Sequence, residues 1–203
     1  MDRGPRIVHT HVFGRDSPKN IPGQESDRPR TMGPYIINHN EYSETSLKRR
    51  ILTKEYLYMN FSEFEAARQF ADTPTGRIAY VEKGNGPVAL FLHGRLLNGY
   101  FWRHQLQELG DNRRCIAVDL LAHGATECEA GQNVSYDGQA AMIKQFLDIR
   151  QIDRVDLVGN DSGTAIAQVF AANNPKRVRT LTLTDGDTYN NWPPAALKDF
   201  LTL

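Results

Sequence analysis

The chain has 203 residues, a formal net charge of zero and 24% charged residues, which is enough sequence for one well-buried domain. Its balanced charge gives no reason to expect a nucleic-acid or membrane-surface partner, and no apolar run approaches the ~20 residues of a membrane-spanning helix. Two cysteines, Cys115 and Cys128, do not make a disulfide framework, and the chain does not open on a signal-peptide pattern. We therefore expect a cytoplasmic protein.

The first part of the chain, residues 1–66, predicts an N-terminal extension. Its first fifty residues are rich in Pro, Gly, Arg, Asp, Asn and His and carry few apolar side chains. Such a segment buries too little surface to offset its ordering entropy, so we expect it to be largely disordered, with at most a short helix at 44–60. Its three histidines, His9, His11 and His39, are irregularly spaced, so we predict no metal site there.

From Phe70 onward, the pattern alternates between strands and helices. The continuous apolar run at 88–92 is typical of a central parallel strand. Further strands are predicted at 77–82, 115–120, 154–158 and 178–184, with helices at 99–109, 136–150 and 162–173. Repeated units of this length predict an α/β domain over 67–190, with a mostly parallel sheet covered by helices on both faces. Residues 192–203 are typical of the start of another helix.

The segment 155–168 is the most informative part of the sequence. It combines a short apolar strand, a turn with Gly159 and Gly163 two residues either side of Asp161, and a helix. This is the pattern of a nucleophile elbow, in which a sharp turn holds the central residue in strained backbone angles and its neighbours must be small. A carboxylate at the centre attacks carbon to give an ester, which suits alkyl halides, epoxides and similar electrophiles.

Other interpretations of this turn remain open. A phosphate cradle is disfavoured, because neither the Walker nor the Rossmann glycine spacing is present and Asp161 would repel a pyrophosphate. Ser162 could be the nucleophile, but the small positions would then be Asn160 and Thr164, which fit a tight elbow less well. The turn could also be purely structural.

Four motifs follow one another along the chain: Leu92-His93-Gly94-Arg95, Tyr100-Phe101-Trp102-Arg103, Asp119-Leu120-Leu121-Ala122-His123-Gly124, and the elbow followed by Asn173-Asn174-Pro175-Lys176-Arg177-Val178. Together and in this order they resemble the α/β-hydrolase superfamily, and in particular its branch of haloalkane dehalogenases and epoxide hydrolases. The resemblance covers residues 70–203. It implies the α/β-hydrolase fold and hydrolysis of a small-molecule substrate without a metal or an organic cofactor.

The resemblance also implies roles for individual residues. Asp161 stands at the position of the family's nucleophile, and the backbone amides of Ser162 and Arg95 stand where the family builds its oxyanion hole. Asp185 ends the strand after the elbow, where some dehalogenases place the acid that orients the catalytic histidine. Asp187 is its alternative, and capping of the following loop is the structural explanation for both.

The sequence departs from both branches at positions that bear on the substrate. Dehalogenases commonly have Asn after the His-Gly pair and Trp after the nucleophile, where this chain has Arg95 and Ser162. Epoxide hydrolases usually show His-Gly-x-Pro, where this chain has Leu96. Alkyl halides and epoxides therefore both remain open, and so do two alternatives: an ester or lactone hydrolase of the same fold, and a non-catalytic homologue.

All six histidines precede Asp161, and the last of them is His123. Family members carry the catalytic histidine far downstream of the elbow, so the resemblance implies a fold that is incomplete at the C-terminus, with 191–203 as the start of the cap. We expect such a chain to form the ester once and then stall, because breaking the ester requires a base that activates water. His93 is usually structural in the family, and His123 is a weak candidate for a substitute base.

An incomplete sheet would also leave the strand at 178–184 on its edge. Open backbone donors and acceptors pair readily with another chain, so we expect self-association through this edge.

Overall fold

The computed structural model describes residues 6–9 and 58–186 of the chain. Most of the helix predicted at 44–60 and the predicted cap region at 191–203 lie outside these residues. In chain order the elements are β1 (Arg6–His9), α2 (Phe61–Ala66), β2 (Gln69–Thr73), β3 (Gly76–Lys83), β4 (Val88–Leu92), the 3-10 helix η1 (Gly99–Trp102), α3 (Arg103–Leu109), β5 (Arg114–Val118), α4 (Tyr136–Ile149), β6 (Val155–Asn160), α5 (Ser162–Asn173), the 3-10 helix η2 (Pro175–Arg177) and β7 (Val178–Thr184).

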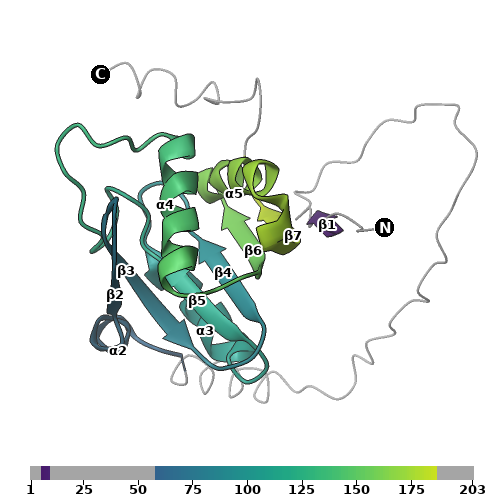
Figure 1. Ribbon diagram of the computed structural model, residues 1–203. Coiled ribbons are helices and arrows are strands. Elements are labelled where there is room, and N and C mark those ends of the chain that lie inside the picture. The colour runs from purple at the N-terminus through teal and green to yellow at the C-terminus, as the bar shows by residue number, and fades with distance from the viewer. Residues whose placement is uncertain (1–5, 10–57, 187–203) are drawn as a thin grey trace, which may run out of the picture. The chain divides into compact units, whose positions relative to one another are not determined.

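The strands form one mixed sheet in the order β1-β7-β6-β4-β5-β3-β2 (Figure 1). Only the pairs β2–β3 and β3–β5 are antiparallel, and the four others are parallel. This arrangement confirms the predicted α/β-hydrolase fold with a mostly parallel sheet. The strand–helix alternation places the carboxyl ends of β4, β5, β6 and β7 at one edge, where α/β proteins bind their ligands.

Two apolar clusters cover the two faces of the sheet. All five side chains of β4 are buried, and they alternate: Leu90 packs with residues of α4 and α5, whereas Phe91 packs with Trp102 and Leu106 of η1 and α3. Because successive side chains of a strand point to opposite faces, this strand requires a helical layer on each side. The sequence-predicted central strand is therefore the centre of the core.

The described fold begins earlier in the chain than residue 67. Helix α2 starts with a capping box, in which the Asn60 side chain accepts the Glu63 N–H at 3.0 Å and the Glu63 carboxylate accepts the Asn60 N–H at 2.9 Å. Phe64 of this helix is 1% exposed and belongs to the α3-side cluster. The sequence pattern did not predict α2, β1 or β2. The packed domain therefore extends across the predicted boundary at residue 66.

Two strand ends also differ from the prediction. Strand β5 ends at Val118, so Asp119 and Leu120 belong to the loop that follows it, and β6 continues to Asn160, directly before the turn. The helix predicted at 99–109 begins as the 3-10 turn η1. Among the described residues, no helix has the length and apolarity needed to cross a bilayer.

The expectation that 178–184 forms a bare sheet edge is wrong. On the side away from β6, β7 pairs in parallel with β1, with Arg6 opposite Thr180 and His9 opposite Leu183. The edge strand is therefore β1, from the part of the chain that we expected to lie outside the domain.

Candidate active site at the turn between β6 and α5

Asp161 holds a strained backbone conformation at the turn between β6 and α5. Its φ of 52° and ψ of −125° lie in a region that a residue with a side chain rarely adopts. The surrounding backbone fixes it there: its N–H is shared between the carbonyl oxygens of Thr184 and Asp185, at 3.3 and 3.1 Å, and its own carbonyl accepts the Thr164 N–H at 2.9 Å. The strained residue is therefore Asp161, the central residue of the turn, as a nucleophile elbow requires.

Gly159 and Gly163 are required by close approach of the backbone to itself. A methyl group on Gly159 would lie 2.4 Å from the Gly163 carbonyl oxygen. A methyl group on Gly163 would lie 2.5 Å from the carbonyl oxygen of Leu92 and 2.6 Å from that of His93. Since backbone atoms cannot move aside cheaply, these positions hold glycine and seat the elbow against the end of β4.

The Asp161 side chain lies directly against Gly94, in the turn that follows β4. A methyl group on Gly94 would lie 2.5 Å from Asp161 Cβ and 2.9 Å from Cγ and Oδ2. The carboxylate does not cap α5, although Asp161 is the N-cap residue. It is half-buried and faces the turn that carries Arg95. The structure thus brings together two motifs that lie 67 positions apart in the sequence.

Ser162 and Arg95 line one pocket of about 160 Å³ beside the elbow. Ser162 is the first residue of α5, so its N–H has no carbonyl within the helix to bond. The remaining lining is mostly apolar and comes from Leu120, Leu121, Ala122, His123, Val134, Tyr136, Gln139 and Ile166. A small apolar group next to Asp161 would fit this lining.

Asp185 follows β7 directly and has a positive φ of 53°. Its carbonyl oxygen accepts the Asp161 N–H at 3.1 Å, while the residue as a whole is exposed to solvent. Its backbone therefore helps to hold the elbow, and its side chain remains available at the same edge of the sheet. Asp187 lies outside the described residues.

His93 is buried and occupied on both ring nitrogens. Nε2 accepts the Leu120 N–H at 3.0 Å, so Nδ1 carries the proton and donates it to the Gly94 carbonyl at 2.8 Å. Burial lowers the pKa of His93 from 6.5 to about 4, which keeps the ring neutral. This histidine ties the turn after β4 to the loop after β5 and has no free nitrogen for catalysis.

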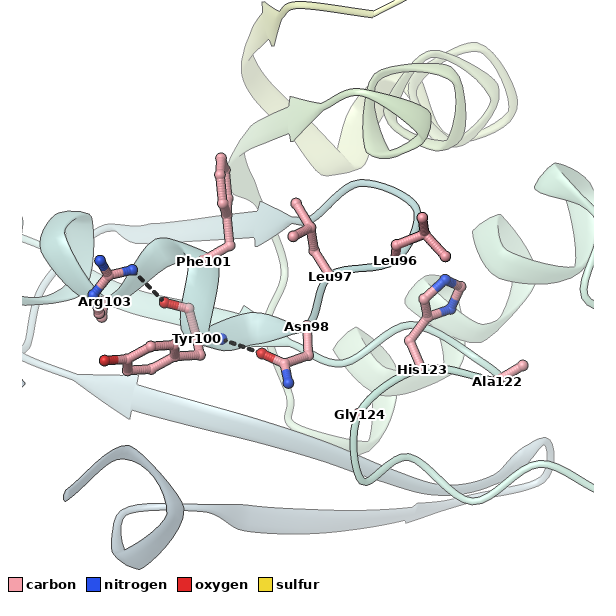
Figure 2. Close-up of a pocket in the computed structure, with 9 residues that line it drawn as sticks. All are labelled: Leu96, Leu97, Asn98, Tyr100, Phe101, Arg103, Ala122, His123 and Gly124. Atoms are coloured by element: carbon pink, nitrogen blue, oxygen red, sulfur yellow. Dashed lines mark hydrogen bonds between the residues drawn. The ribbon is translucent and has the colours of Figure 1, made fainter. Parts of the chain in front are cut away.

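His123 is half-buried, and its ring centroid lies 5.2 Å from that of His93. Its Nδ1 lies 2.9 Å from the Leu121 carbonyl oxygen, so Nδ1 donates there and Nε2 is the basic nitrogen. His123 lines both the pocket next to Ser162 and a larger one of about 580 Å³. Figure 2 shows it opposite Leu96 in the larger pocket, which continues past Asn98 to Tyr100 and Arg103.

Sequence analysis did not identify two buried residues that position the lining loops. Gln139 of α4 accepts the Leu121 N–H at 2.9 Å and donates to the Leu121 carbonyl at 3.0 Å. Asp119 accepts the N–H groups of Gly99 at 2.7 Å and Ala125 at 2.8 Å. Asp119 could be noticed as a charge at the end of an apolar strand, whereas nothing in the pattern of α4 distinguishes Gln139.

Comparison with known proteins defines the family. A family model described as the alpha/beta hydrolase fold matches residues 87–202, which is more than half of the chain. The chain belongs to the α/β-hydrolase family. The match includes the turn after β4, the elbow and β7.

Individual relatives include haloalkane dehalogenases, as predicted, together with hydrolases of other names. The chain is 35% identical over 126 residues to haloalkane dehalogenase 2 of Mycobacterium bovis, covering 62% of this chain and 43% of that protein. It is 40% identical over 82 residues to 2-hydroxy-6-oxo-2,4-heptadienoate hydrolase of Pseudomonas putida, covering 40% of this chain and 30% of that protein. The chain thus spans less than half the length of these curated relatives.

Solved structures of epoxide hydrolases share the fold. The epoxide hydrolase CorEH aligns with a TM-score of 0.58 and 25% identity, over 66% of this chain and 50% of that one. An epoxide hydrolase from Bacillus megaterium aligns with a TM-score of 0.56 and 28% identity, over 58% of this chain and 42% of that one. Within the described residues, no group of three or more His, Cys, Asp or Glu side chains could hold a metal ion.

Proposed function

We propose that the chain carries the nucleophile of a hydrolase that opens small alkyl halides, epoxides or similar electrophiles through an aspartyl ester at Asp161. The observation that carries the proposal is the strained turn at Asp161, with its carboxylate held against Gly94. Strain of this kind persists only where the surrounding structure enforces it, and it concentrates at functional sites. Similarity to haloalkane dehalogenases and epoxide hydrolases supports the substrate class.

In the first step the nucleophile is the carboxylate itself, so no general base takes part. A carboxylate oxygen of Asp161 bonds to the electrophilic carbon, and the electron pair of the breaking bond leaves with the halide or with the epoxide oxygen. The small apolar pocket beside Ser162 suits the alkyl part of such a substrate. Arg95 and Ser162 replace the usual halide donors, so we infer a leaving group that does not depend on an indole N–H.

The second step breaks the ester. Water adds to Cγ of the esterified Asp161 and negative charge develops on its carbonyl oxygen. The backbone amides of Ser162 and Arg95 are the proposed donors to this oxygen, each worth about 3–4 kcal/mol in a preorganised site. Activating the water requires a general base, and in this chain every histidine precedes Asp161. Asp185 is proposed as the acid that orients such a base.

Intact-mass spectrometry tests the proposal directly. The 203-residue chain is incubated with a reactive alkyl halide and, separately, with an epoxide, and the adduct is then mapped by peptide sequencing. We expect one adduct per chain on Asp161, which accumulates because the ester is not hydrolysed. Asp161→Asn should abolish the adduct, and Ser162→Ala, which keeps the backbone amide, should retain it. Rapid turnover without an adduct, or an adduct that survives Asp161→Asn, would refute the proposal.

A second candidate is hydrolysis of carboxylic esters or lactones with Ser162, or a water, as the nucleophile. The position of Ser162 in the pocket lining and the similarity to 2-hydroxy-6-oxo-2,4-heptadienoate hydrolase favour it. Esterase activity that is lost in Ser162→Ala but kept in Asp161→Asn would support this candidate over the first. If a folded sample neither forms the adduct nor cleaves esters, the chain is a non-catalytic homologue.

We also propose that the protein acts in the cytoplasm on a small molecule, without a nucleic-acid or membrane partner. Both cysteines are free, with Cys115 buried and Cys128 exposed, which suits a reducing compartment.

A further inference from the structure

Strands β6 and β7 lie side by side (Figure 1), and on one face of them every second residue of β6 stands opposite a threonine of β7. The three pairs are Asp156 with Thr180, Val158 with Thr182, and Asn160 with Thr184. Hydrogen bonds between side chains join the first and the third pair. The middle pair differs, because the valine side chain can neither donate nor accept a hydrogen bond. The third pair lies directly before Asp161.

The pair Asn160–Thr184 is joined by more than one hydrogen bond. The Asn160 amide donates to the Thr184 hydroxyl at 3.1 Å and to the Thr184 carbonyl oxygen at 3.2 Å. The Thr184 hydroxyl in turn donates to the carbonyl oxygen of Gly159 at 3.1 Å, so its proton and a lone pair are both used. One threonine therefore binds the two residues that precede Asp161.

The backbone hydrogen bonds of Asp161 are long for a residue in a strained conformation. Its N–H is divided between the carbonyl oxygens of Thr184 at 3.3 Å and Asp185 at 3.1 Å, both longer than the usual length of about 2.9 Å. A strained residue keeps its conformation only where the surrounding structure enforces it. On the other side of the turn, the Thr164 hydroxyl donates to the Thr184 carbonyl at 3.2 Å. Side-chain hydrogen bonds to Thr184 therefore restrain the turn both before and after Asp161.

We propose that Asn160 and Thr184 are positioning residues for Asp161: their paired side chains fix the turn, so that the carboxylate stays directed at the electrophilic carbon. The described residues that line the pocket beside the elbow include neither of them. The pair therefore acts through the backbone next to Asp161 and not through contact with the substrate. The inference rests on the ester proposed at Asp161, and it assigns the pair a role in the rate of ester formation rather than in substrate binding.

Thr184→Val tests the pair while keeping the shape and the β-propensity of the side chain. The substitution removes the hydroxyl that binds Asn160 and Gly159, and it leaves the carbonyl oxygen of residue 184 in place. The rate at which an alkyl halide labels Asp161 is measured by intact mass at rising halide concentration. We expect the maximal rate to fall about tenfold, since displacing a reacting group by a full 1 Å costs about 10²-fold. The half-saturating halide concentration should stay unchanged, because the pocket lining is untouched.

Three further variants separate positioning from a general loss of stability. Thr182→Val makes the same substitution on the same face of β7, opposite Val158, and should label at the unmodified rate. Thr184→Ser keeps the hydroxyl and should restore most of the rate. Asn160→Ala removes the other half of the pair and should also slow labelling. Combined with Thr184→Val, it should slow labelling by less than the product of the two single effects, because both substitutions remove the same hydrogen bond.

Amide hydrogen exchange without substrate gives a second readout. In Thr184→Val the Asp161 N–H should exchange at least tenfold faster, while slow exchange of the β4 amides shows that the core is intact; if that core is lost, Asn160→Ala carries the test.

The inference is overturned if a folded Thr184→Val labels Asp161 at the unmodified rate, or if Thr182→Val slows labelling equally. If the unmodified chain forms no adduct, the proposed function fails by itself. The exchange of the Asp161 N–H then still decides: an unchanged rate in Thr184→Val and Asn160→Ala overturns the role of the pair, and a faster rate supports its hold on the turn.

Discussion

Adding one methyl group at Gly94 should displace the proposed nucleophile. In Gly94→Ala the new Cβ would lie 2.5 Å from Asp161 Cβ, whereas carbon atoms pack at about 3.5 Å or more, so one of the two must move by about 1 Å. Overpacking of this size costs about 1–3 kcal/mol in the free energy of unfolding. A 1 Å displacement of a reacting group lowers the rate by about 10²-fold.

The assay is the rate at which the alkyl halide labels Asp161, followed by intact mass, together with urea unfolding. Gly131→Ala is the matched control, because it adds the same methyl group at a position with no atom within 4 Å. Its φ of +80° makes the control cost about 1–2 kcal/mol of stability, with no change in labelling rate. If Gly94→Ala is folded and labels Asp161 at the unmodified rate, contact between Gly94 and Asp161 does not position the nucleophile.

Two other predictions concern the buried groups behind the pocket. Since burial lowers the pKa of His93 from 6.5 to about 4, the unfolded chain takes up its proton first as pH falls; stability is fully present above pH 6.5 and falls by up to about 3 kcal/mol toward pH 4. Urea unfolding between pH 4 and 7 should show this slope in the unmodified chain and a flatter one in His93→Gln; equal slopes would assign the acid sensitivity to other groups. Gln139→Leu leaves the Leu121 N–H without its partner and removes one of the two donors to the Leu121 C=O, so it should cost about 1–3 kcal/mol in thermal unfolding. A loss below about 1 kcal/mol would mean that water replaces the amide.

The sequence predicts those helices and strands whose own residues favour that structure without help from distant parts of the chain. The run Val88–Leu92 is buried on both faces and could be read without its neighbours, and Ser162–Asn173 begins and ends where the elbow and Pro175 require. The strand β1 could not be predicted this way, because its four residues show no periodicity of their own and their backbone pairs with β7, which is distant in the sequence. Helix α2 was also not predicted, although Asn60 and Glu63 have the spacing of a capping box.

In the candidate site, too, some residues are recognisable from the sequence alone and others only from the fold. Asp161 and its flanking glycines are recognisable because an elbow restricts residue size at fixed spacing. The role of Gly94 depends on a contact across 67 positions, so the sequence offers only a motif that resembles the family. Gln139 presents an ordinary polar residue on a helix, and only the fold brings its amide to Leu121.

The elbow is bound to the end of β7. The carbonyl oxygen of Thr184, at the end of this strand, accepts hydrogen bonds from the Asp161 N–H at 3.3 Å, the Asn160 side chain at 3.2 Å and the Thr164 hydroxyl at 3.2 Å. These three hydrogen bonds attach the strained turn to the end of β7. The turn is therefore restrained only if the end of β7 is itself restrained. Since β1 covers β7 up to Leu183, one residue before Thr184, pairing at the outer edge of β7 restrains the strand end to which Asp161 is bound.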